Sequence, residues 1–251
     1  MRILYFSRRQ LQRGIWLAVL GVSLLVWGYW YDRYLQAVPA VLPQPIYQGN
    51  GREKEIALTV NVFWGEEYLP QLLDILAREK VAATFFIGGQ WAEQFPALTR
   101  EIYQRGHEIG SHGYAHPHPD QLSVTGNMQD IRRAEEVLVR ITGQRPGLYA
   151  PPYGEHGPAV LQAAREAGYR TILWSVDTVD WQRPAPEIIS SRVLEKVHNG
   201  AIVLMHPTEP TVEALPGIIR ELKSRGYRLV TVSRLLRQLD GEGDGKTEHK
   251  V

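Results

Sequence analysis

The chain contains no cysteine among its 251 residues. This absence excludes disulfide bonds and thiolate metal sites, and it leaves the redox compartment undetermined. A charge excess of one sign is also lacking, because the formal net charge is +1. The basic residues are scattered rather than gathered in a stripe, so the sequence does not favour a nucleic-acid or other polyanion partner. It also contains no internal repeat and no glycine-rich loop of the kind that cradles phosphate.

Most of the chain has the composition of one globular domain, with 44% hydrophobic and 22% charged residues. Residues 15–31 differ, because this run contains no charged side chain. Its length is near the lower limit for a helix that spans a bilayer. Four arginines in residues 1–14 predict a cytoplasmic N-terminus, and the tryptophans and tyrosines at the end of the run resemble an interfacial belt. A single-pass anchor would place the remaining chain outside the cytoplasm.

Two other interpretations of this run compete with the anchor. A cleavable signal peptide would use residues 38–40, a poor small-residue cleavage site, and would give a secreted protein; the uncleaved anchor is favoured. A buried core helix is disfavoured because the run has no polar face. Residues 32–54 contain several prolines and glycines and are predicted to form a linker, while the charged, glycine-rich residues 240–251 are predicted to be a disordered tail.

Strand-like and helix-like segments alternate from residue 55 to residue 239, which predicts a parallel sheet buried by helices. Strands are expected at residues 56–62, 81–87, 106–109, 169–175, 201–205 and 227–232, and helices at 67–80, 90–105, 127–142, 157–167, 186–198, 211–225 and 233–239. The alternation by itself fits either an open doubly wound sheet or a barrel. In both folds, functional groups gather at the carboxyl ends of the strands.

Two histidines, His112 and His116, stand four residues apart in a glycine-containing turn after an expected strand. Neutral imidazole is the commonest metal ligand in proteins, and two at this spacing can bind one ion. An isolated pair of this kind is nevertheless more often a surface turn. Segments 61–65 and 177–181, together with His206, also follow expected strands. We therefore expect all of them to lie on one face of the domain.

Four motifs occur in order along this domain: His-Gly-Tyr-Ala-His at 112–116, Ala-Pro-Pro-Tyr-Gly at 150–154, Asp-Thr-Val-Asp-Trp at 177–181 and Leu-Met-His at 204–206. The set resembles motifs two to five of the polysaccharide deacetylase family, also known as the NodB homology domain or carbohydrate esterase family 4, and looks closest to its sporulation-associated branch. The resemblance implies a distorted (β/α) barrel of about seven parallel strands, following the N-terminal transmembrane helix. It also implies a metal-assisted hydrolase that removes acetyl groups from cell-wall sugars.

The resemblance assigns chemical roles to the histidines. His112 and His116 would hold a divalent metal, with zinc expected first and cobalt or manganese as alternatives. His206 would be the general acid that protonates the leaving amine, and Asp180 would tune it. The metal would polarise the acetyl carbonyl and lower the pKa of its bound water.

The remaining matched residues would form the substrate groove. Pro152 and Tyr153 would form one wall, Trp181 the other, and Leu204 would line the acetyl pocket. Considered alone, Trp181 is typical of an ordinary core aromatic and Tyr153 of a rigid turn after two prolines. The order of the four motifs favours the groove roles.

The first motif departs from the family pattern. Most members have Thr-Phe-Asp-Asp-Gly, where one aspartate is the general base and the other a metal ligand; residues 59–65 here read Thr-Val-Asn-Val-Phe-Trp-Gly and lack both carboxylates. Asn61 cannot act as a base, since an amide does not accept a proton, although its carbonyl oxygen would be a weak metal ligand. The arginine of the third motif, which orients the base, is replaced by Ala150. Glu66 and Glu67 are the nearest carboxylates, and first-turn helix residues are their more ordinary interpretation.

Two hypotheses about function follow from these motifs. The first is a membrane-anchored, extracytoplasmic polysaccharide N-deacetylase, a hydrolase of non-peptide carbon–nitrogen bonds that acts on peptidoglycan or a related glycan in a sporulation-linked role. The second is a non-catalytic relative that binds glycan or has a structural role in the spore envelope. The missing aspartates and arginine motivate the second hypothesis and leave turnover open.

Overall fold

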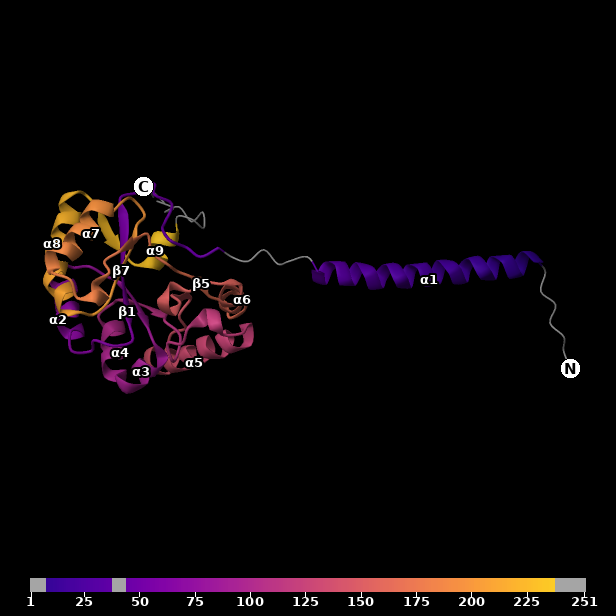
Figure 1. The fold of residues 1–251 in the computed structure, drawn as a ribbon, viewed down its shortest axis with the longest axis horizontal. Coiled ribbons are helices and arrows are strands. Elements are labelled where there is room, and N and C mark those ends of the chain that lie inside the picture. Colours follow the sequence, from indigo (N-terminus) through magenta and orange to yellow (C-terminus); the bar gives the residue numbers. More distant parts are fainter. Residues whose placement is uncertain (1–7, 38–43, 238–251) are drawn as a thin grey trace, which may run out of the picture. The chain divides into compact units, whose positions relative to one another are not determined.

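A computed structural model describes residues 8–37 and 44–237 (Figure 1). The chain divides into two compact units, Met1–Leu42 and Pro43–Val251. In the first unit, helix α1 extends over Arg8–Ala37 and is longer than the predicted residues 15–31. Its segment Gln12–Trp30 is long and apolar enough to cross a membrane, a property that signal sequences share. The predicted cleavage site at 38–40 and the predicted tail at 240–251 lie outside the described residues.

The second unit is built on a sheet of eight strands, all paired in parallel. The strands are β1 (Glu55–Val62), β2 (Thr84–Ile87), β3 (Glu108–Ser111), β4 (Leu148–Tyr149), β5 (Arg170–Thr171), β6 (Val176–Asp177), β7 (Ile202–Met205) and β8 (Arg228–Val230). Seven follow the order β5-β4-β3-β2-β1-β7-β6, and β8 pairs with the start of β1. The predicted barrel of about seven parallel strands is confirmed, in the form of an open half-barrel.

Helices cover the outside of this half-barrel, except for the last helix of the chain, which packs into the cluster on the inner side (Figure 1). They are α2 (Leu69–Arg78), α3 (Gly89–Gln94), α4 (Pro96–Gln104), α5 (Val124–Thr142), α6 (Pro158–Glu166), α7 (Pro186–Lys196), α8 (Glu209–Ser224) and α9 (Val232–Arg237). Local signals fix their ends: α5 starts after Ser123, whose Oγ accepts a hydrogen bond from the N–H of Gly126, and stops at Gly143, whose φ of 74° suits glycine.

Strand β1 separates two apolar regions. Ile56, Leu58, Val60 and Val62 face the core between the sheet and the helices, where they pack with leucines of α2 and α8. Ala57 belongs to a second cluster on the inner side of the half-barrel. Side chains alternate along a strand, so burial on both faces gives β1 its nearly continuous apolar sequence. The same alternation directs Asn61 to the inner face.

The structure differs from the predicted elements at several points. The helix expected at residues 90–105 is two helices, α3 and α4, because the chain leaves helical geometry at Phe95 and Pro96 begins a new helix. The strand expected at residues 169–175 is confined to β5, and β4 was not predicted because two residues carry no periodic pattern. Residues 44–54, part of the predicted linker, contact the sheet: Ile46 bridges Ile172, and Gln48 bridges Ala201.

Candidate active-site cavity

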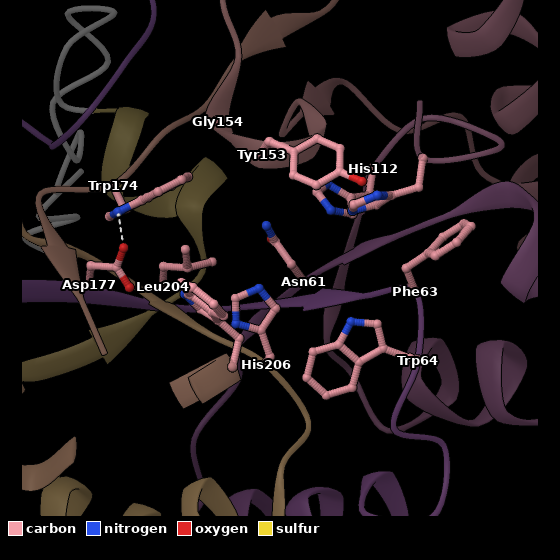
Figure 2. A pocket seen from close by; sticks show the side chains of 12 residues that line it. Asn61, Phe63, Trp64, His112, Tyr153, Gly154, Trp174, Asp177, Leu204 and His206 are labelled. Carbon is pink, nitrogen blue, oxygen red and sulfur yellow. Dashed lines mark hydrogen bonds between the residues drawn. The ribbon is translucent and has the colours of Figure 1, made fainter. Parts of the chain in front are cut away.

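A cavity of about 460 Å³ opens at the carboxyl ends of the strands (Figure 2). The structure brings together in its lining residues from all five motif segments: Asn61, Phe63, Trp64, His112, His116, Tyr153, Gly154, Trp174, Asp177, Trp181, Leu204 and His206. Of the residues assigned to the site from sequence, Asp180 lies buried behind His206, and buried Pro152 precedes Tyr153 without lining the cavity. Trp174 was missed, since no motif marks it.

His112 stands one residue beyond β3 and is almost fully buried. Its Nδ1–H donates a hydrogen bond of 2.7 Å to the backbone carbonyl of Ala150, which fixes the tautomer and leaves Nε2 unprotonated. Burial, followed by the nearby His116, lowers the pKa of His112 to about 3. The ring is therefore neutral and carries an available nitrogen lone pair.

The turn that carries His116 is held by a buried carboxylate. Asp130 on α5 accepts hydrogen bonds from the backbone N–H groups of Tyr114 and Ala115, at 2.8 and 3.1 Å. Gly113 has a φ of 74°, and a Cβ there would come within 2.5 Å of Asp130 Oδ2, so glycine suits this position. His116 has a φ of 55°, its ring centroid lies 5.0 Å from that of His112, and burial lowers its pKa.

His206 follows β7 and is oriented by Asp180, which is fully buried. The Nδ1–H of His206 donates to Asp180 Oδ1 at 2.8 Å. Asp180 Oδ2 accepts from the His206 backbone N–H at 2.7 Å and from the Thr211 hydroxyl at 2.6 Å. Three hydrogen bonds therefore fix the carboxylate, and the opposite edge of the imidazole faces the cavity. The Trp64 ring stacks on His206, with centroids 5.7 Å apart and planes 5° from parallel.

Exposed aromatic rings border the opening of the cavity. Tyr153 is 57% exposed, with a φ of 59°, and its ring stacks on His118 at a centroid distance of 4.0 Å. Trp181, on the short helix after β6, is 55% exposed. Leu204 is buried beneath them. Flat apolar rings at the mouth of a cavity offer stacking surfaces to a ligand with apolar faces, such as the C–H faces of a sugar ring.

Asn61 occupies the end of β1 and is 6% exposed. Figure 2 shows its side chain between those of His112 and His206, with the amide nitrogen directed into the cavity. Its Oδ1 is buried and has no hydrogen-bond partner among the described residues. The next residue, Val62, is packed in the core on the other face of the sheet. Position 61, the first of the two aspartate positions of the motif, thus carries a neutral amide, and position 62 does not line the cavity.

No available carboxylate compensates for these replacements in the described lining. Asp177 is the one carboxylate that lines the cavity, and both of its oxygens are engaged: Oδ2 accepts from Trp174 Nε1 at 3.1 Å and Oδ1 from the Val179 N–H at 2.8 Å. Glu66 and Glu67 lie in the turn before α2 and do not line the cavity. A general base in this position is therefore missing.

The residues that face the cavity do not fit a catalytic divalent metal. Such sites usually have three protein ligands, commonly two imidazoles and a carboxylate or a third imidazole. His112 and His116 supply two nitrogens, whereas the third candidate, Asn61, supplies a neutral amide oxygen. Within residues 8–37 and 44–237, no group of three histidine, cysteine, aspartate or glutamate side chains is placed to hold a metal.

Comparisons with known proteins agree with these motifs. A sequence model of the family described as polysaccharide deacetylase matches residues 48–172. The chain is 42% identical, over 81% of its length, to the uncharacterised protein YlxY of Bacillus subtilis, and spans 65% of that relative. It is 35% identical, again over 81% of its length, to a peptidoglycan-N-acetylglucosamine deacetylase of Bacillus cereus, of which it covers 72%.

Solved structures extend the likeness to the fold. The crystal structure of a carbohydrate esterase family 4 pseudoenzyme from Bacillus anthracis is similar with a TM-score of 0.75 and 40% identity, over 77% of this chain and 69% of that one. A mutant of that pseudoenzyme, described as having restored enzymatic activity, is similar with the same TM-score of 0.75 and 38% identity, over 77% of this chain and 71% of that one. The resemblance read from the motifs is confirmed: this chain belongs to the polysaccharide deacetylase family of hydrolases, carbohydrate esterase family 4.

Proposed function

We propose that the chain is a non-catalytic member of its family that binds the N-acetylated glycan of peptidoglycan in this cavity, outside the cytoplasm. The observation that carries the proposal is Asn61, a neutral amide at the position of the family's general base, in a cavity without an available carboxylate. The sequence motifs alone favour an active hydrolase over a non-catalytic relative. The geometry of the cavity favours the opposite order.

Hydrolysis of an acetamide requires a base that takes a proton from the attacking water. An amide side chain does not accept that proton at neutral pH, and loss of a positioned base typically lowers the rate by about 10²- to 10⁴-fold. The weak donor set for a metal removes the second source of water activation. With both missing, turnover is expected to be negligible even though the His206–Asp180 pair is intact.

Glycan binding does not depend on either missing part. It requires a cavity of suitable size, apolar surfaces and a few polar groups, and Tyr153, Trp181 and Leu204 supply the surfaces. The similarity to a peptidoglycan deacetylase and to a pseudoenzyme supports this combination of a retained groove with lost chemistry.

The proposed location rests on α1. Its apolar segment Gln12–Trp30 follows arginines, which favours a single-pass anchor with a cytoplasmic N-terminus and an extracytoplasmic domain. Protease added to intact protoplasts should digest the domain but leave an N-terminal tag protected. A mature protein that lacks its first residues would support the cleaved signal peptide instead.

The test of the proposed function compares binding with turnover. Full-length protein in detergent should bind N-acetylglucosamine oligomers or soluble peptidoglycan fragments saturably and release no acetate. Replacement of Trp181 by alanine should weaken the binding without unfolding the protein. Absence of saturable binding, or acetate release that depends on His206, would contradict the proposal.

The second candidate is an active deacetylase, and the preserved His112, His116 and His206 favour it. Acetate release from N-acetylglucosamine oligomers with added Zn²⁺, Co²⁺ or Mn²⁺ should then exceed that of the His112→Ala, His206→Ala double variant. A structural role in the spore envelope is compatible with glycan binding and predicts that a pulldown from sporulating cells recovers envelope proteins.

A further inference from the structure

The oxygen of the Asn61 amide is a polar atom to which the described part of the chain donates no hydrogen bond. Asn61 is 6% exposed, its Oδ1 has no hydrogen-bond partner within residues 8–37 and 44–237, and its nitrogen is directed into the cavity (Figure 2). Burying an unpaired polar group costs free energy, so such a group in a cavity indicates a ligand that completes its hydrogen bonds.

An amide side chain is complementary to another amide. It offers a donor, Nδ2–H, and an acceptor, Oδ1, whereas an aspartate offers acceptors alone. The acetamido group of an N-acetylated sugar presents the matching pair, a carbonyl oxygen and an N–H. The terminal torsion of asparagine is soft, so rotation about it can turn the edge of the Asn61 amide that carries both groups toward a ligand.

The surroundings of Asn61 suit an acetamido group in size and polarity. Leu204 and Trp174 contribute apolar surface to the same cavity, on which a methyl group can pack. Both oxygens of Asp177 are already engaged by Trp174 and Val179.

These features disfavour the binding of a deacetylated sugar. Its ammonium group would have to leave water for a largely apolar cavity in which the carboxylate is already hydrogen-bonded. It also lacks the carbonyl oxygen that would accept the hydrogen bond from Asn61 Nδ2. Removal of the acetyl group therefore removes a favourable contact and adds a desolvation cost.

We infer that the cavity discriminates the acetylation state of the glycan, with the Asn61 amide as the partner of the acetamido group, so that N-acetylated sugar binds more tightly than glucosamine. The inference rests on the proposed function, because it gives the selectivity of the same glycan-binding cavity. It assigns a role in ligand recognition to Asn61, which stands at the position of the family's general base.

Isothermal titration calorimetry of the full-length protein in detergent tests the inference with two probes, tetra-N-acetylchitotetraose and fully deacetylated chitotetraose. The acetylated tetramer should bind roughly 10- to 100-fold more tightly, the range expected when buried polar groups lose their partners. An isosteric Asn61→Leu variant should lose most of this preference while retaining its affinity for the deacetylated probe. A Trp181→Ala variant is the matched control and should weaken binding of both probes by similar factors.

The possible failures are distinguishable. If neither probe binds the wild-type protein, the proposed function itself is overturned. If both bind equally, if the amine is preferred, or if Asn61→Leu keeps the full preference, glycan binding stands and the inference is overturned. Thermal unfolding of each variant verifies that it is folded, and Asn61→Ala provides a second truncation should the leucine disturb the fold. Acetate in the titrated sample would contradict the non-catalytic proposal.

Discussion

Asp180 should stabilise the folded domain whether or not the protein is catalytically active. The carboxylate is fully buried and accepts three hydrogen bonds, from the ring and backbone N–H of His206 and from the Thr211 hydroxyl. It thereby joins the short helix after β6 to the residue that follows β7 and to the first turn of α8. We predict that Asp180→Ala markedly destabilises the domain even if the protein has no catalytic activity.

The magnitude follows from the number of bonds that are lost. Asp180→Ala removes the acceptor of three hydrogen bonds, and a buried donor left unpaired costs about 1–3 kcal/mol, so the total loss should be about 3–5 kcal/mol. That loss is a large share of the roughly 5–15 kcal/mol that stabilises a typical domain. With about 2–4 °C per kcal/mol for a domain of this size, the melting temperature should fall by roughly 10 °C.

Urea unfolding of the full-length protein in detergent, followed by tryptophan fluorescence, measures the effect. His206→Ala is the matched control: it removes one of the three bonds and leaves the backbone N–H and Thr211 paired with Asp180, so its cost should be smaller, about 1–2 kcal/mol. If Asp180→Ala costs less than His206→Ala, or leaves the free energy of unfolding unchanged, the structural interpretation of the pair is refuted.

Three further predictions concern other residues of the domain. Asn61→Leu should raise the free energy of unfolding by about 1–2 kcal/mol in the absence of glycan, because it removes a buried unpaired amide; a lower value in urea unfolding would contradict the assignment of Oδ1 as unpaired. Mass spectrometry of the purified protein should find well under one zinc ion per chain, and the Asn61→Asp variant should bind more zinc than the wild type. The His112→Ala, His116→Ala double variant is the control. Stoichiometric zinc in the wild type would refute the conclusion that these residues fit a metal poorly. Burial lowers the pKa of His107 to about 4. Between about pH 6.5 and pH 4 the unfolded state therefore binds a proton at His107 that the folded state does not, so the free energy of unfolding should fall as the pH drops through this range. The slope between pH 7.5 and 5 should be smaller in His107→Gln, and an unchanged slope would contradict this cause.

Much of the framework could be predicted from local patterns. Strand β1 and helix α8 have apolar periodicities that tertiary contacts reinforce, so both were found with nearly correct ends. Strand β4 could not be found, because its two residues are selected by pairing with β3 and β5 rather than by their own sequence. The division at Pro96 was missed because apolar spacing continues across both helices.

The candidate site, too, could be predicted from the sequence only in part. The motifs identified His112 and His206 because their spacing is local in the chain. They did not predict that Asp177 is engaged by Trp174, or that the Asn61 oxygen has no partner. The surroundings of Asn61 depend on the pairing of β1 with β2 and β7, which are distant in the chain, whereas the bond between Trp174 and Asp177 joins residues three apart and depends on the conformation of that turn. Both properties bear on the chemistry that the cavity supports.

The replacements at positions 61 and 150 have a common electrostatic cause. An arginine in place of Ala150, which is 3% exposed, would bring a charge to a buried position beside the cavity. A carboxylate at position 61 would pair with that charge, whereas the Asn61 amide would not. Once the carboxylate is gone, alanine is the less costly residue at position 150, and the Ala150 carbonyl still orients His112. The two changes are therefore coupled, and they leave positions 61 and 150 without charge, as the proposed binding of an uncleaved amide requires.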